Sequence, residues 1–193
     1  MSKLNWYEKL NQYFPVEEMK SKKHMEVLLD EKGDIYHKDE GTDYVIMYVE
    51  TEDFVFIDYL FVSKNSRGQG LGKKLLDSLK EKGKPIILEV EPLDYEDSDT
   101  EKRLNFYKRA GFEHAESIGY TRRSLSTKEL NTLEILYWSP ENDSEELIYE
   151  KMKHTYEHIH TYKDEQLYGE SYQTVDEVLS FSKNDDTVKK EKA

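Results

Sequence analysis

A long apolar segment that leads into a glycine-rich turn and then into a patterned helix is the feature that most constrains the fold of this chain. The segment FVFIDYLFV (residues 54–62) is apolar on both faces except for Asp58, so we expect a strand buried in the middle of a sheet. The turn after it has glycine at three alternate positions, and leucines then recur at helical spacing up to residue 79. Such a helix packs its apolar stripe on a sheet. The junction therefore predicts a sheet with helices on its faces.

Apolar periodicity places further strands and helices on both sides of this junction. The predicted fold class is α/β, a mixed α+β sheet with helices on both faces. The strand candidates are residues 34–39, 44–50, 85–92, 112–120 and 132–138. The helix candidates are two pieces before residue 33, the segment after the glycines, and residues 101–112.

The character of the chain changes in its last quarter. Residues 144–162 have a helical pattern, residues 174–181 suggest a short second helix, and the chain then ends almost without apolar side chains. We therefore expect a main domain over residues 1–139, a helical C-terminal extension over 140–181 and a disordered tail over 182–193. Several tyrosines in the extension favour packing against the main domain. A dimer or protein-partner surface is the alternative.

Composition argues against several classes of function. The 193 residues include 41 acidic and 28 basic side chains, a formal net charge of −13, which opposes nucleic acid and anionic membranes and favours amine-bearing partners. Without cysteine, the chain has no disulfide, thiolate nucleophile or cysteine zinc site. It shows no signal-peptide core or membrane-length apolar segment, so we expect a cytoplasmic protein. His154 and His158 lie one helical turn apart but on the wet face, and we expect no metal site.

The glycine junction has the chemistry of a phosphate site. The first N–H groups of a helix lack partners within it and carry partial positive charge, and glycines let a phosphate approach the backbone. Arg67, Lys73 and Lys74 add positive charge in an acidic chain. The dinucleotide pattern G-x-G-x-x-G fails at Lys73, and the P-loop pattern fails at Arg67 and Lys74. A flexible turn is the plain alternative.

The stretch LFVSKNSRGQGLGKKLL (residues 60–76) resembles the acyl-CoA signature of the Gcn5-related N-acetyltransferases (GNAT), written Q/R-x-x-G-x-G/A. Arg67, Gly70 and Gly72 fill its fixed positions. Downstream, IILEV and LNFYKRAGF resemble the next strand and helix of the family in the same order, so the likeness spans roughly residues 35–138. The resemblance implies the GNAT acyl-CoA N-acyltransferase fold and acetyl-CoA as cosubstrate, with no metal.

The resemblance also implies a reaction in which an amine attacks the thioester of acetyl-CoA directly. Tyr107 matches the family tyrosine near the CoA sulfur and is the expected general acid, and Glu89 matches the glutamate that serves as base in one branch. The alternatives are a core aromatic for Tyr107 and a structural carboxylate for Glu89. Asp58, Glu50 and Glu52 are further base candidates. The implied cofactor-binding residues are Leu60, Phe61, Val62, Arg67, Gly68, Gln69, Gly70, Leu71, Gly72, Lys73 and Thr100.

Two functions stay open at the level of the residues. One is an N-acetyltransferase whose acceptor is a small amine, a protein N-terminus or a lysine. The other is a non-catalytic relative that binds CoA, or has lost it, and acts as a regulatory or interaction module. The intact glycine signature and Tyr107 favour the enzyme. Thr100 stands where family members often have a cofactor-contacting asparagine, and this favours the module.

Overall fold

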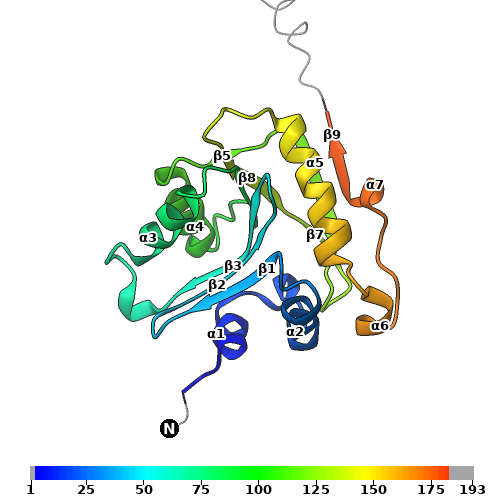
Figure 1. Cartoon of the computed structure of the whole chain (residues 1–193), viewed down its shortest axis with the longest axis horizontal. Helices are drawn as coiled ribbons and strands as arrows, with labels where there is room; N and C mark the ends of the chain where they lie inside the picture. Colours follow the sequence, from blue (N-terminus) through cyan, green and yellow to red (C-terminus); the bar gives the residue numbers. More distant parts are fainter. Residues whose placement is uncertain (1–2, 183–193) are drawn as a thin grey trace, which may run out of the picture.

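The computed structural model describes residues 3–182, and a mixed sheet forms its centre (Figure 1). Six strands run in the order β1-β2-β3-β4-β8-β5. Strands β3 and β4 pair in parallel, and the other neighbours pair antiparallel. The strands are β1 (Tyr36–Glu40), β2 (Tyr44–Glu50), β3 (Val55–Val62), β4 (Ile86–Val90), β8 (Glu134–Trp138) and β5 (Glu113–His114). The predicted α/β class with a mixed sheet is confirmed.

Helices α3 (Leu71–Lys80) and α4 (Ser98–Arg109) cover one face of this sheet. The helix predicted after the glycines is α3, and its Leu76 and Leu79 are buried in the core between helix and sheet. Helix α4 begins after Asp97, whose carboxylate accepts a backbone N–H of the first turn. Helix α4 therefore starts at a residue whose side chain caps its first turn.

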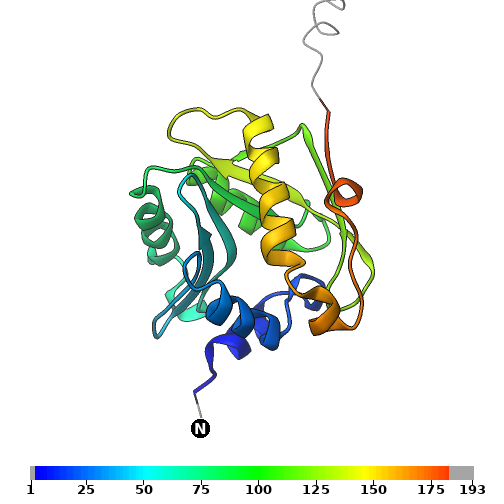
Figure 2. The same cartoon turned by 45° about the vertical axis from the view of Figure 1, so that its right-hand side comes forward.

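Helices α1 (Trp6–Tyr13), α2 (Lys22–Glu31) and α5 (Glu145–Thr155) pack over the opposite face, as the turned view in Figure 2 makes clear. Leu10 of α1 and Met25 of α2 are fully buried in a second apolar core. This core joins the first thirty residues to a helix from the last quarter of the chain. Helices from the first and the last quarter of the chain thus pack on the same side of the sheet.

A second, three-stranded sheet has the order β7-β6-β9. Its strands are β7 (Leu130–Thr132), β6 (Ile118–Arg123) and β9 (Leu179–Phe181). The sequence predicts single strands over residues 112–120 and 132–138, and the structure divides each between the two sheets. The first division has a local cause: the N–H of Ile118 bonds to the carbonyl of Ala115, so the chain turns between β5 and β6.

The described C-terminal segment packs against the rest of the protein. After α5 come the π-helical turn η3 (Tyr156–His160), α6 (Asp164–Tyr168), α7 (Val175–Val178) and β9. Residues 174–181, expected as a helix, are thus α7 followed directly by a strand. Met152 and Ile159 are fully buried, and the hydroxyl of Tyr168 lies 2.8 Å from a ring nitrogen of His24. The tail expected over residues 182–193 lies outside the described residues except for Ser182.

Two short 3-10 turns, η1 (Val16–Glu18) and η2 (Lys64–Ser66), complete the described elements. No helix among residues 3–182 has the length and apolar character needed to cross a membrane.

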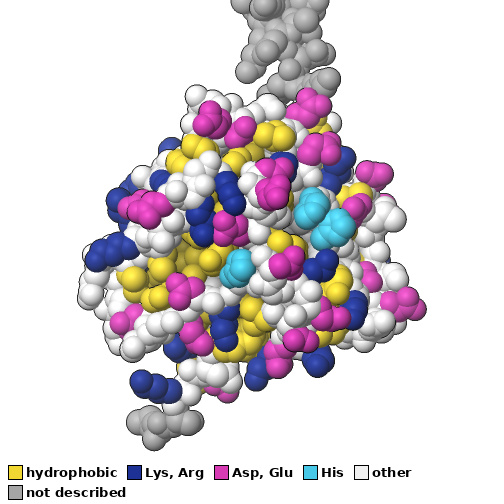
Figure 3. All heavy atoms as spheres, in the orientation of Figure 1, with side chains coloured by type: hydrophobic (Ala, Val, Ile, Leu, Met, Phe, Trp, Pro, Cys, Tyr) yellow, Lys and Arg dark blue, Asp and Glu magenta, His cyan; other side chains and the backbone are white. Residues whose placement is uncertain are grey.

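On the face drawn in Figure 3, acidic and basic side chains are interspersed rather than segregated. The excess of acidic residues is therefore spread over this surface and does not form one block.

Candidate active site

Strands β3 and β4 separate part-way along their length and leave a gap in the sheet. They pair over Val55–Ile57 and Ile86–Leu88 only, although β3 continues to Val62 and β4 to Val90. A cavity of about 620 Å³ opens at this gap. Because the strands no longer pair with each other there, backbone N–H and C=O groups at the gap are available to a bound molecule.

A β-bulge in β3 lies at the start of the gap. Met47 faces Tyr59 and the next residue of β2, Tyr48, faces Ile57, so Asp58 is the extra residue. Side chains before the bulge alternate between the two cores, and the extra residue reverses the alternation after it. As a result Leu60 reaches the core on the α3 and α4 side, as Ile57 does. The bulge therefore decides which residues of β3 face the cavity.

The glycine turn forms one end of the cavity. Gly68 and Gly70 have φ angles of 82° and 79°, in the left-handed region, and no atom lies within 4 Å of a Cβ added to either. Gly70 is the N-cap of α3, so the first N–H groups of the helix point out from this turn. Gly72 has another role: a Cβ there would lie 2.9 Å from the ring of Phe106. It lets α4 pack closely on α3, which the sequence did not predict.

Tyr107 of α4 lies in the cavity wall with 6% of its surface exposed. Its ring packs edge-on against Phe106 and Phe112, with centroids 5.0 and 5.5 Å away. Among residues 3–182 its hydroxyl has no hydrogen-bond partner. Burial raises the pKa of Tyr107 well above its usual value, against a smaller opposing effect of Arg103. The phenol is therefore protonated at neutral pH and free to donate to a bound molecule.

Glu89 of β4 lies in the same wall and is held by two partners. Its Oε2 is 2.7 Å from Nε2 of His160, and its Oε1 is 3.5 Å from Nε of Arg122. Burial by itself would raise the pKa of Glu89, but the contact with His160 and the charge of Arg122 outweigh burial and hold this pKa well below its usual range. Burial also lowers the pKa of His160. Glu89 is therefore ionised and accepts a hydrogen bond from Nε2 of His160.

The wall beside Glu89 carries further charged groups, of which the sequence predicted only Asp58. Lys20 Nζ is 2.7 Å from the Asp58 carboxylate, and each side chain is 3% exposed. Tyr36 donates a hydrogen bond to the other oxygen of Asp58 at 2.7 Å. Glu18 lies 3.8 Å from Arg103. Burial raises the pKa of Glu18 to about 8, against the smaller effect of Arg103. One end of the cavity is therefore polar, buried and rich in ion pairs.

Comparison with known proteins decides the family. A family model described as "Acetyltransferase (GNAT) domain" matches residues 24–114. A Bacillus subtilis (strain 168) protein named "Putative acetyltransferase YjbC" is 66% identical over 176 residues, which are 91% of this chain and 92% of that protein. This chain belongs to the GNAT family of acetyltransferases. The resemblance stated from the glycine signature is thus confirmed.

A solved structure supports the same fold for this GNAT chain. It is described as "Putative acetyltransferase from GNAT family from Bacteroides thetaiotaomicron" and is 25% identical to this chain. The match covers 85% of this chain and 90% of the other, with a TM-score of 0.61. The GNAT acyl-CoA N-acyltransferase fold is therefore confirmed, and the chain is an acyltransferase by family.

Most residues that the GNAT resemblance implies for cofactor binding lie together in the cavity wall. These are Leu60, Val62, Arg67, Gly68, Gly70, Leu71, Gly72 and Lys73. Three do not line the cavity. The ring of Phe61 packs on Tyr13 at 5.5 Å, and the Gln69 amide donates to the carbonyl of Asn65. The hydroxyl of Thr100, 4% exposed, bonds within the loop before α4.

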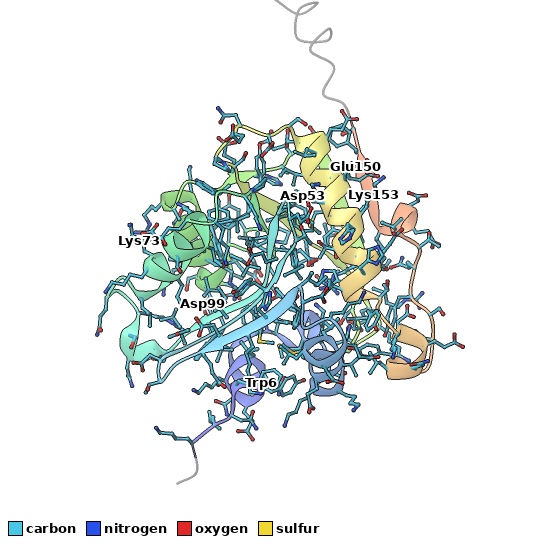
Figure 4. The ribbon with its side chains drawn as sticks, in the orientation of Figure 1. Trp6, Asp53, Lys73, Asp99, Glu150 and Lys153 are labelled. Atoms are coloured by element: carbon cyan, nitrogen blue, oxygen red, sulfur yellow. The ribbon has the colours of Figure 1, made fainter. Side chains whose placement is uncertain are left out.

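The other predicted groups divide in the same way. Glu50 pairs with Lys82 and Lys84 away from the cavity, and Glu52 is exposed. Asp58 lines the cavity. In Figure 4, Lys73 and Asp99 lie on the side of α3 and α4, and Glu150 and Lys153 lie along α5 on the other side. Within residues 3–182 no three potential His, Asp or Glu ligands gather closely enough to hold a metal ion.

One local signal could have found Arg122. In IGYTRR, Ile118 and Tyr120 are buried and the next residue on the same side of strand β6 is Arg122, also buried. Alternation of side chains along a strand places all three on one face. Glu18, Lys20 and His160 have no comparable signal, because their roles depend on contacts between distant parts of the chain.

Proposed function

We propose that this GNAT chain is an N-acetyltransferase that moves the acetyl group of acetyl-CoA to a primary amine by direct attack. One observation carries the proposal. A single cavity runs from the left-handed glycine turn, along the gap between β3 and β4, to the buried side chains of Tyr107 and Glu89. The proposed cofactor site and the proposed proton-transfer site therefore belong to the same cavity.

The cofactor half follows from the backbone. The N–H groups at the start of α3 and the charge of Arg67 suit the diphosphate of acetyl-CoA. The free edge of β3 over Leu60–Val62 suits the amide groups of the pantetheine arm. Arg67 Nε already donates to the carbonyl of Val62 at 3.2 Å. That contact ties the side chain to the strand edge from which it would reach the diphosphate.

The reacting half uses the two predicted side chains. The amine nitrogen forms a bond to the carbonyl carbon, and the C–S bond breaks as the thiolate leaves. Tyr107 is the general acid and donates to the departing sulfur. Because its pKa lies above that of a thiol, its hydrogen bond supplies most of the stabilisation. Glu89 accepts the proton from nitrogen, and its low pKa makes it a weak base that acts once the new N–C bond has made that proton acidic.

We also propose that the acetyltransferase domain spans residues 1–139 and that residues 140–181 form an extension which completes it. His160 of the extension bonds to Glu89. Residues Ile148 and Met152 are fully buried in the main core. The extension would therefore act on the site through Glu89 as well as on stability.

Calorimetric titration of acetyl-CoA tests the proposal. We expect binding to the native chain and loss of binding in Gly70→Trp, because a large side chain at the turn blocks the start of α3. Gly83→Trp is the matched control: Gly83 also has a positive φ, 71°, and open space around its Cβ position, so it carries the same backbone strain. An amine panel scored by release of free CoA follows.

Two results would contradict the proposal. Absence of binding at millimolar acetyl-CoA would exclude the enzyme and the CoA-binding module together. Binding without turnover of any amine would favour the non-catalytic module.

A further inference from the structure

Arg122 is a buried cation whose hydrogen-bonding capacity is almost unused. It lies on β6, lines the cavity, and its side chain is 8% exposed. An arginine carries five N–H donors, yet among residues 3–182 the guanidinium makes no hydrogen bond. Its one ionic contact joins Nε to Glu89 Oε1 at 3.5 Å, and Nε is buried without a hydrogen-bond partner. Buried donors are normally satisfied, so this group points to a bound acceptor of hydrogen bonds.

The charges around Arg122 leave room for an anion. Lys20 and Asp58 form a neutral pair at 2.7 Å. Burial raises the pKa of Glu18 to about 8, against the smaller effect of Arg103, and the neighbouring carboxylate of Glu91 raises it further. Arg122 itself has one ionic contact, with Glu89, so donors of its guanidinium remain for a second carboxylate. In a low-dielectric site an added carboxylate is attracted more strongly than it would be in water.

We propose that the amine acceptor of this enzyme carries a carboxylate next to its primary amine, and that Arg122 binds that carboxylate. This inference rests on the acetyltransferase function proposed above. A planar guanidinium binds a carboxylate through two parallel N–H···O bonds. Glu89, beside Arg122, receives the amine. The two groups are 3.5 Å apart, so the amine and the carboxylate of the acceptor are separated by very few bonds, as in an α-amino acid.

This local chemistry differs from the bias of the whole chain. A formal net charge of −13 favours cationic acceptors at long range, but salt screens charges beyond about 10 Å. Inside the cavity the nearest charged groups determine which acceptor binds, and Arg122 is one of the residues that line it. A zwitterionic acceptor is compatible with the negative net charge of the chain and with the charges in the cavity, since its ammonium suits Glu89 and its carboxylate suits Arg122.

The test uses matched acceptors with the native enzyme. Alanine, leucine, phenylalanine and lysine are each assayed as the free acid, the primary amide and the decarboxylated amine. We expect kcat/KM for the acids to exceed that for the amides by about 10- to 100-fold, as for a charge-assisted pair. A peptide that begins with aspartate, compared with one that begins with alanine, distinguishes a free amino acid from a peptide with an acidic first residue. Equal values for acids, amides and amines would overturn the proposal.

Arg122→Lys tests the residue itself, because lysine keeps the positive charge but lacks the planar guanidinium that can donate two parallel hydrogen bonds. We expect the acid-to-amide ratio of kcat/KM to fall at least 10-fold. The matched control is Arg123→Lys, at the neighbouring position, where the arginine is partly exposed and pairs with Glu170. An equal loss of kcat/KM for acids, amides and amines would show that Arg122 only balances the negative charge of Glu89. The proposal would then fail while the acetyltransferase function stands.

Two measurements keep the proposal testable if the assay or the variant fails. The ratio in the native enzyme needs no variant, so misfolding of Arg122→Lys would not remove the test. If CoA binds but no amine is acetylated, the proposed function fails by itself. Titration of leucine and leucinamide into the CoA complex then decides the carboxylate site: tighter binding of leucine supports it, and equal binding overturns it.

Discussion

Two carboxylates in one cavity wall have opposite pKa shifts, and their neighbours explain the difference. Glu89 meets Arg122 and a hydrogen bond from His160, which together outweigh burial and lower its pKa. Glu18 is also buried, but its nearest cation is Arg103 at 3.8 Å, and one of its oxygens has no hydrogen-bond partner. Burial therefore dominates, and together with the neighbouring carboxylate of Glu91 it raises the pKa of Glu18 to about 8. Residues of the same type are thus set to opposite charge states by their surroundings.

The raised pKa of Glu18 predicts a pH dependence of stability. A native pKa of about 8, against 4.5 for the ordinary group, means that the folded protein holds a proton that the unfolded chain loses. The native chain should therefore lose stability relative to Glu18→Gln as pH rises from about 4.5 to about 8, by at most about 1.4 kcal/mol per pH unit, and level off above that. Urea unfolding of both proteins from pH 5 to 9 measures this. A change of the opposite sign would mean that the pairing with Arg103 outweighs burial.

Tyr107 yields a second prediction at the level of one atom. Its hydroxyl has no hydrogen-bond partner among residues 3–182, so Tyr107→Phe removes a donor without breaking a contact of the fold. We expect kcat to fall by about 10²-fold, with the Kd for acetyl-CoA nearly unchanged. Steady-state rates and calorimetry on the same samples measure both. A loss of affinity as large as the loss of rate would contradict the assigned role.

At the level of elements, the end of one strand pairing and one bulge build the site. The register of β3 and β4 stops at Ile57 and Leu88, and the bulge at Asp58 reverses which side chains face the gap. The bulge involves one extra residue, and the unpaired ends of the two strands are only a few residues long. Their consequence is that Leu60 and Glu89 face one cavity.

Helix α5 leads to a prediction about the C-terminal segment. Met152 is fully buried in the core that also contains Leu10 and Met25. We expect Met152→Ala to lower the free energy of unfolding by about 2–5 kcal/mol in a single transition for the whole chain. Leu130→Ala, at a position 68% exposed, is the control and should change it by less than about 0.5 kcal/mol. Urea unfolding followed by far-UV circular dichroism and by tryptophan fluorescence compares them. Two separate transitions would show that the extension unfolds independently.

At the level of the whole molecule, segments from the first and the last quarter of the chain meet at the site. Lys20 comes from the segment before α2, and His160 comes from the turn after α5. Both lie near Glu89 of the central sheet, His160 by direct contact. The polar end of the cavity is therefore assembled from three distant parts of the sequence, whereas most of the predicted cofactor-binding residues lie within residues 60–73.

This division explains how much could be predicted. The buried strand, the glycine turn, α3 and Tyr107 are set by periodicity and by a local signature, so the sequence predicted them. The strand β2 was also predicted at its observed bounds, residues 44–50. Thr100 was selected by position in the family pattern, and its hydroxyl instead bonds to the loop that precedes α4. The split of residues 112–120 between two sheets depends on partners that periodicity does not specify.

By itself the sequence determined the fold class, the family and most of the residues proposed to bind the cofactor, because helix and strand periods, left-handed glycines and helix starts depend on neighbouring residues. The tertiary structure alone brought together the residues of the proposed acceptor side. There the charge of Glu18, the partners of Glu89 and the unused donors of Arg122 depend on burial and on distances between residues far apart in the chain. Those quantities exist only once the chain has folded.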